Sequence, residues 1–143
     1  MAVTSSSLRD DVLAYARDVA RLAAQDTARR IVSDPATPRD TGKMAGATRA
    51  AGGVRTTGTA AVARIENPTM EAEWTDKGTQ PHVIVPRRRG GVLVFHWPKA
   101  GGVVFLRRVH HPGSRKHVGW FDKVAARHWP DACRRAVAAL GTR

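Results

Sequence analysis

The chain lacks features that several common classes of protein require. Among its 143 residues there is one cysteine, Cys133, so neither an internal disulfide nor a cysteine-based metal site can form, and a small half-buried residue in a helix is its favoured role. No apolar run approaches the roughly 18 residues of a membrane-spanning helix, and the amino terminus has no apolar signal segment. We therefore expect a soluble protein with one domain over 1–143 and flexible ends at 1–6 and 141–143.

Acidic residues are scarce in the second half of the chain. Residues 81–143 contain 13 Lys or Arg but only two carboxylates, Asp122 and Asp131, whereas residues 1–80 are nearly neutral. A basic surface of this size attracts polyanions, which include nucleic acid, an acidic protein and, less readily, an anionic membrane. High charge also keeps a protein in solution, so charge alone is a weak indicator of the partner.

The cations of the second half lie mainly in two stretches. Residues 87–91 read RRRGG, and residues 107–117 read RRVHHPGSRKH. Side chains of this kind can contact phosphates, but aromatic residues that would stack on single-stranded bases are few, and nothing predicts sequence-specific readout. The candidate residues for contact with a partner or DNA are Arg87, Arg88, Arg89, Lys99, Arg107, Arg108, Arg115 and Lys116.

Groupings of catalytic or metal-binding residues are also lacking. No carboxylate lies between Asp76 and Asp122 to orient a histidine or complete a metal site. Ser114 follows a turn glycine without an acid nearby in the sequence, and Glu71 and Glu73 are two apart on a predicted helix, so they do not share a face. We expect neither enzyme activity nor a metal or cofactor, and turn or surface roles for His82, His96, His110, His111, His117 and His128.

Helical periodicity marks both ends of the chain. Apolar residues at spacings of three and four predict a helix over 8–32, capped by Ser7 and stopped before Pro35. A second helical segment is predicted over 114–140. Pro130 interrupts it and marks either a kink or the start of another helix, the second being slightly favoured.

A short alanine-rich helix is predicted after the first one. It covers about 42–50, with Asp40 or Thr41 as its cap. Gly52 and Gly53 are expected to end it.

A hairpin and a second short helix follow. Alternating residues predict two strands within 54–67 about a turn near Gly58. Asn67 can then cap a helix of about two turns in which Pro68 takes the first position. Gly78 is expected to end that helix.

The segment up to residue 110 is rich in β-branched and aromatic residues. Strands are predicted over 82–86, 92–97 and 102–110, separated by loops that contain glycine pairs. The strand at 92–97 is expected to be central and covered on at least one face. The predicted fold class is α+β, with a long N-terminal helix, an antiparallel sheet of four to six strands, and a C-terminal helix packed on one face of the sheet.

Four short motifs occur in a characteristic order. They are Asp-Thr-Gly at 40–42, Gly-Thr-x-Pro-His at 78–82, Leu-x-Phe at 93–95 and His-Pro-Gly at 111–113. With the order of helices and strands, they make the chain, over about 5–140, resemble the neck and tail-completion protein family of long-tailed double-stranded DNA phages, also called minor capsid or head-tail joining proteins.

The resemblance implies a structural subunit. Such proteins are α+β and form a ring of six copies at the junction between the portal connector and the tail tube. The implied partners are copies of this chain, connector or head-closure proteins, and the tail tube or tail terminator protein, with non-specific contact to packaged DNA and no membrane. The implied location is the virion head-tail junction, after assembly in the cytoplasm of the bacterial host.

Two positions depart from the family pattern. The pattern often has Leu where this chain has Met44, a change that conserves volume. The basic loop Arg87–Arg89 leaves open whether this member faces DNA or an acidic connector protein. We expect the loop 87–91 and the hairpin turn 99–102 to project from the sheet toward neighbours or the channel.

Three other functions compete with a neck subunit. A tail terminator ring, which caps the tail tube, has the same architecture. A free nucleic-acid-binding protein is suggested by the basic half of the chain. An enzyme comes third, because acid partners for the histidines are missing.

Overall fold

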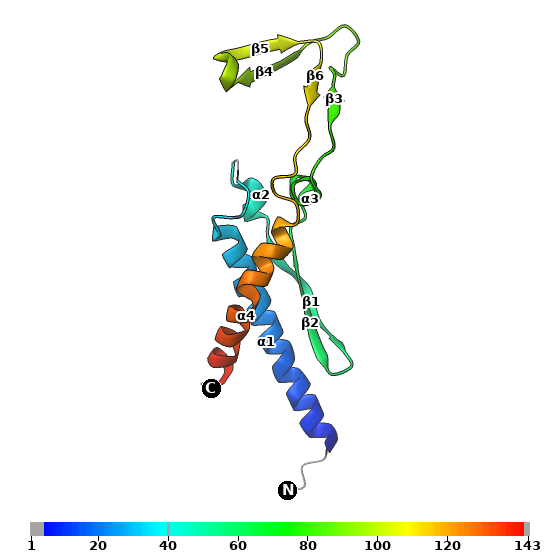
Figure 1. Cartoon of the computed structure of the whole chain (residues 1–143). Coiled ribbons are helices and arrows are strands. Elements are labelled where there is room, and N and C mark those ends of the chain that lie inside the picture. Colours follow the sequence, from blue (N-terminus) through cyan, green and yellow to red (C-terminus); the bar gives the residue numbers. More distant parts are fainter. Residues whose placement is uncertain (1–4, 40, 142–143) are drawn as a thin grey trace.

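The computed structural model describes residues 5–39 and 41–141 as an elongated α+β chain (Figure 1). The α+β class and the long helices at both ends are as predicted from the sequence. Residues 1–4, 142 and 143, for which flexible ends were predicted, and Asp40, a predicted helix cap, lie outside the described residues. The elements are α1 (Ser5–Ser33), α2 (Lys43–Gly46), β1 (Arg49–Thr57), β2 (Ala60–Glu66), α3 (Met70–Lys77), β3 (His82–Ile84), β4 (Leu93–Trp97), η1 (Pro98–Ala100), β5 (Gly102–Leu106), β6 (Val109–His111) and α4 (Trp120–Gly141).

Helix α1 forms where the periodicity predicts it but begins earlier. It starts at Ser5, so Ser7 lies inside the helix, and its predicted role as the cap was wrong. At the other end Thr37 Oγ1 donates to the Ile31 carbonyl at 2.6 Å, and the Asp34 carboxylate accepts from the Ala36 N–H at 2.7 Å. These bonds, with the proline that follows Asp34, stop the helix.

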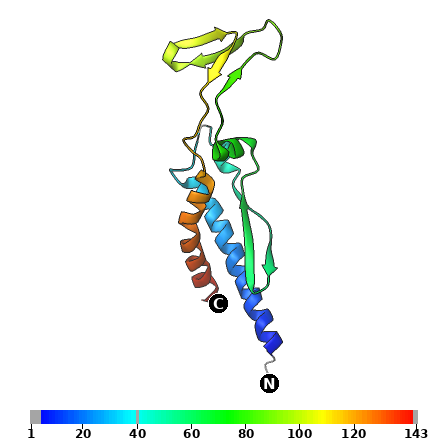
Figure 2. The same ribbon diagram turned by 45° about the vertical axis from the view of Figure 1, so that its right-hand side comes forward.

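Helix α4 packs against α1 rather than on a sheet face, which corrects the prediction (Figures 1 and 2). Its small buried residues Ala132 and Ala136 meet Ala23 of α1, because alanines let two helices approach closely. The helix begins at Trp120 rather than at residue 114, and it continues without a break through Pro130, so the predicted second start was also wrong.

The β1–β2 hairpin turns at Gly58 as predicted and packs against α1. The preceding helix α2 has only four residues, because the chain is already extended from Arg49 onward. Gly52 and Gly53 therefore do not end a helix. They lie in β1, where the register shifts between Ala51 and Arg55, and such an irregularity is a common place for glycine in a strand.

Helix α3 begins two residues later than predicted. Thr69, not Asn67, is its cap, and the Thr69 hydroxyl accepts from the Ala72 N–H at 3.2 Å. Asn67 supports the cap instead, since its side-chain oxygen accepts from the Thr69 N–H at 3.2 Å and from the Thr69 hydroxyl at 2.7 Å. Gly78 follows the last residue of α3, as predicted.

The strands do not form one sheet of four to six strands. Among the described residues they make three separate two-stranded antiparallel ribbons, β1–β2, β3–β6 and β4–β5. The strand predicted over 102–110 divides at Arg107 and Arg108, and its two halves pair with different partners. The strand predicted over 92–97 as central is β4, whose side chains from Val94 to Trp97 are exposed, because it pairs on one side only.

Residues 79–114 form an arm that extends away from the two long helices (Figures 1 and 2). The arm contains β3–β6 nearer to the helices and β4–β5 at its far end. We call the remainder of the described chain the body. The buried side chains of the larger core cluster, Ile31, Ala72, Trp120 and Val124, all belong to the body.

Candidate interaction surface

The base of the arm is closed by backbone pairing. The Thr79 N–H donates to the Ser114 carbonyl at 2.9 Å, and the Ser114 N–H donates to the Thr79 carbonyl at 3.0 Å. Gly78 and Gly113 flank this pair with φ of 74° and 80°. A Cβ at Gly113 would lie 2.3 Å from the Thr79 oxygen, and one at Gly78 would lie 2.6 Å from the Ser114 oxygen. Only glycine fits such an approach of two backbones.

The two motifs that contain histidine beside proline face each other above this base. His82 pairs with His111 across β3 and β6, and their ring centroids are 5.0 Å apart. The His82 Nδ1–H donates to the Gln80 carbonyl at 2.8 Å, and the His111 Nδ1 accepts from the Gly113 N–H at 3.1 Å. The described residues contain no group of three or more His, Cys, Asp or Glu that could hold a metal ion.

Asp76 connects the end of α3 to the start of α4 within the body, next to the base of the arm. Its carbonyl accepts from the Gly119 N–H at 2.9 Å, and its carboxylate accepts from the Phe121 N–H at 3.0 Å. The carboxylate therefore satisfies a free N–H in the first turn of α4, where negative charge is stabilising. The end of α3 and the start of α4, which lead into and out of the arm, are held together here.

The β4–β5 ribbon exposes apolar side chains on both faces. Val94, Val103 and Phe105 are 57%, 58% and 66% exposed on one face. Phe95 and Trp97 lie on the other face, which is more shielded but still open to solvent. A two-stranded ribbon alone is marginally stable in water, and exposed aromatic and β-branched side chains of this density are typical of a surface that another protein covers.

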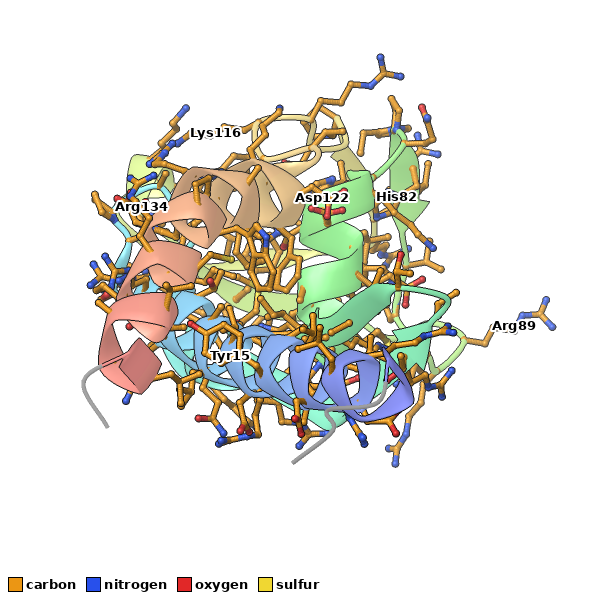
Figure 3. All side chains as sticks on the ribbon, turned by 90° about the horizontal axis from the view of Figure 1, so that it is seen from below. Tyr15, His82, Arg89, Lys116, Asp122 and Arg134 are labelled. Atoms are coloured by element: carbon orange, nitrogen blue, oxygen red, sulfur yellow. The ribbon has the colours of Figure 1, made fainter. Side chains whose placement is uncertain are left out.

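All eight cations named from the sequence are exposed, and the structure brings only some of them together. Arg87–Arg89 lie in the loop between β3 and β4, and Arg107 and Arg108 form the connection between β5 and β6. Lys99 lies in η1 at the opposite end of the β4–β5 ribbon, whereas Arg115 and Lys116 lie beyond the arm's base. Figure 3 shows the side chains of Arg89 and Lys116 extending outward from the backbone.

The predicted projection of two loops agrees with this arrangement. The loop 87–91 and the turn 99–102 both belong to the exposed far part of the arm. Which neighbour either of them meets stays a prediction.

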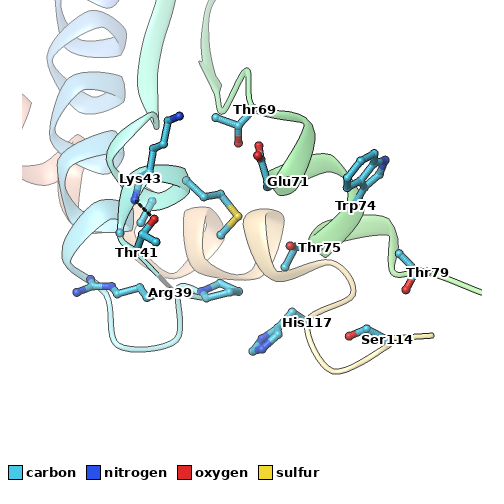
Figure 4. A pocket seen from close by; sticks show the side chains of 14 residues that line it. Arg39, Thr41, Lys43, Thr69, Glu71, Trp74, Thr75, Thr79, Ser114 and His117 are labelled. Atoms are coloured by element: carbon cyan, nitrogen blue, oxygen red, sulfur yellow. Dashed lines mark hydrogen bonds between the residues drawn. The ribbon is translucent and has the colours of Figure 1, made fainter. Parts of the chain in front are cut away.

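A pocket of about 730 Å³ lies where the arm joins the body (Figure 4). Ser114, His117 and Glu71 all line it, so the fold brings an acid to the pocket that holds Ser114, which sequence spacing could not reveal. Among the described residues that line the pocket, no hydrogen bond links these three side chains (Figure 4), whereas an activated serine needs a base within hydrogen-bond reach. The exposed Trp74 gives the pocket an apolar wall.

Cys133 is half-buried in α4, as the sequence predicts. Burial raises the pKa of its thiol above the usual value. The thiol is therefore less ionised than a free cysteine at neutral pH, which disfavours reactivity.

Comparison with protein-family models, with curated proteins and with solved structures finds no significant match. Within the described residues, the helices are too polar or too short to cross a bilayer.

Proposed function

We propose that the chain is a virion structural protein, a ring-forming neck or tail-completion subunit that joins the connector to the tail tube at the head-tail junction of a tailed phage. The observation that carries this proposal is the arm, whose β4–β5 ribbon leaves Val94, Val103 and Phe105 uncovered far from the body's core. The resemblance of the ordered motifs to the phage family supplies the kind of assembly.

The arm suits a closed ring for a physical reason. The apolar surface of the arm is a β-ribbon, whereas the body presents mainly long helices. A contact between the arm of one subunit and the body of the next therefore joins two different surfaces. Contacts of this head-to-tail kind close into rings when the rotation between subunits allows it. The free edges of β4 and β5 can also pair with a strand of a neighbour.

A structural role is proposed in preference to catalysis. Ser114, His117 and Glu71 share a pocket without a bond between nucleophile and base, and the pKa of Cys133 is raised rather than lowered. Both features disfavour nucleophilic chemistry.

The test measures assembly with a matched pair of variants. Val103→Asp changes an exposed valine of the arm, and Val62→Asp changes a similarly exposed valine of β2 in the body. Light scattering of the full chain, alone and with the connector of its phage, should show a ring-sized mass for the unchanged chain and for Val62→Asp. Val103→Asp should remain a monomer with unchanged helical circular dichroism. A ring-sized mass for Val103→Asp would exclude the arm as the subunit interface, and absence of any assembly with the connector would contradict the proposal.

The same arm would also suit a tail terminator ring. Position separates the two roles, because a terminator is present on purified tails that lack heads, whereas a neck subunit remains with filled heads. Labelling the chain in such preparations decides between them.

A further inference from the structure

We propose that five arginines at one corner of the arm bind the phosphate backbone of duplex DNA. This arginine corner consists of Arg87, Arg88, Arg89, Arg107 and Arg108. The inference goes beyond the proposed function, since it concerns a property that the unassembled chain should already possess.

The strand register brings the two arginine runs to the same place. Ile84 pairs with Val109 in β3–β6, and Leu93 pairs with Leu106 in β4–β5. Arg107 and Arg108 are the whole connection from Leu106 to Val109, and Arg87–Arg89 lie in the loop that connects their partners, Ile84 and Leu93. Both runs therefore span the same junction between the two ribbons, and Figures 1 and 2 show both connections at the far end of the arm.

The charge of the corner is not compensated by carboxylates of its own part of the chain. Residues 77–121 contain no Asp or Glu, and no ion pair of the described residues includes a cation of the corner. Arginines of the body behave differently, as Arg49 pairs with Glu66 at 3.0 Å and Arg127 pairs with Asp34 at 3.2 Å. Guanidinium groups without a carboxylate partner gain most from a ligand with dense negative charge.

The chemistry of the corner favours phosphate over an acidic protein. Protein interfaces have an apolar centre, whereas residues 87–91, which lie between the exposed Val85 and Val92, contain only arginine and glycine. Interfaces with DNA are polar and strongly positive, and the planar fork of arginine binds phosphate oxygens with two parallel hydrogen bonds. Duplex DNA carries about one negative charge per 1.7 Å of its axis, so several arginines can each find a phosphate.

The form of the corner also predicts how DNA is bound. The arginines lie on loops, and neither a helix nor a long ribbon presents them to a groove. Backbone contacts carry no sequence information. Binding should therefore be independent of DNA sequence and should weaken steeply as salt increases.

The experiment is a fluorescence-anisotropy titration of the full chain with a short labelled duplex of mixed sequence, repeated at several salt concentrations. One variant changes all five corner arginines to glutamine. A control changes five exposed arginines of the body, Arg9, Arg17, Arg21, Arg29 and Arg55, to glutamine, so both variants lose the same charge. Circular dichroism checks that both retain their helices.

We expect the corner variant to bind at least about a hundredfold more weakly at low salt, with a salt slope that is smaller by about three to four, since each contacted phosphate contributes about 0.9. The body control should lose less than about tenfold, because distant charges are screened. A variant with lysine at all five corner positions should retain most of the affinity and the slope, since it retains the charge.

Three outcomes would overturn the proposal. Equal losses in the corner and body variants would mean that DNA responds to net charge alone. Absence of binding by the unchanged chain at low salt would exclude a DNA site. Equal competition by polyglutamate, at matched charge, would indicate a site for an acidic protein. Ring assembly is measured separately by mass, so failure here leaves the proposed neck function standing.

Discussion

The His128 Nε2 lies 2.7 Å from the Asp34 Oδ2, although 94 residues separate them in the sequence. The Asp34 side chain is 3% exposed, and it also accepts from Arg127 at 3.2 Å and from the Ala36 N–H at 2.7 Å. One carboxylate thus ends α1 and binds that end to the middle of α4. In an elongated body with few large buried side chains, this polar contact adds to the packing of Ala23 against Ala132 and Ala136 between the two long helices.

Replacing Asp34 with asparagine should lower the free energy of unfolding by about 1–3 kcal/mol, because Arg127, His128 and the Ala36 N–H lose a buried carboxylate as their partner. Burial alone would raise the pKa of Asp34, but hydrogen bonds from Ala36 and His128 and the charge of Arg127 lower it below 3.8 overall. A carboxylate whose pKa is lower in the folded chain stabilises the fold fully at pH values above its pKa in the unfolded chain. This stabilisation is lost as pH falls through its pKa in the folded chain. Denaturant unfolding of both chains should therefore show a constant difference near neutral pH that shrinks below about pH 4.

Asp18→Asn is the control for this prediction. Asp18 pairs with Arg21 at 3.1 Å on the surface of α1, where both side chains are about half exposed. Its loss should change stability by less than about 0.5 kcal/mol. Equal effects at Asp18 and Asp34 would contradict a special role for Asp34.

Gly113→Ala should open the base of the arm. The new Cβ would meet the Thr79 carbonyl, whereas the same change at Gly101, which also has a positive φ, would meet nothing within 4 Å. Both changes carry a backbone cost of about 1–2 kcal/mol, but only Gly113→Ala should break the Thr79–Ser114 pairing. Hydrogen exchange of the Thr79 and Ser114 amides should accelerate in Gly113→Ala and remain slow in Gly101→Ala.

Thr69→Ala should destabilise the chain by about 1 kcal/mol, since the cap of α3 is lost. Thr69→Ser keeps the hydroxyl and should restore most of that stability. Thermal unfolding of the three chains measures the difference, and an equal loss in both variants would show that the methyl group, not the hydroxyl, matters.

Pro130→Ala should stabilise the chain. Pro130 is exposed inside α4, where proline supplies no N–H to the helix and crowds the preceding turn. We expect the free energy of unfolding to rise by about 1–3 kcal/mol, seen as a higher midpoint in denaturant. A lower midpoint would show that the packing of α4 on α1 depends on the proline.

Local patterns in the sequence predicted the positions of helices and turns better than they predicted helix caps and strand pairing. The apolar spacing located α1 to within a few residues, and Gly58 and Gly78 marked real turns. Caps were misplaced because Asn67 and Thr69 are both good caps and only packing selects one. Gly52 and Gly53 end a helix or interrupt a strand equally well by local rules, and long-range pairing with β2 decided for the strand.

In the candidate site, too, local patterns did not reveal which distant residues lie close together. Exposure of the eight cations is what their charge leads one to expect, but only the register of β3–β6 and β4–β5 shows which five share a corner. Glu71 could not be connected with Ser114 from spacing, because α3 and the arm's base meet only in the folded chain.

The backbone pair at Thr79 and Ser114 has a consequence for how such a protein can evolve. The two chain ends that enter and leave the arm lie side by side, so an arm of another length or composition can be exchanged there by recombination without rearranging the helices. The body can then be conserved while the arm diversifies, and changes in binding partner require no change in the scaffold.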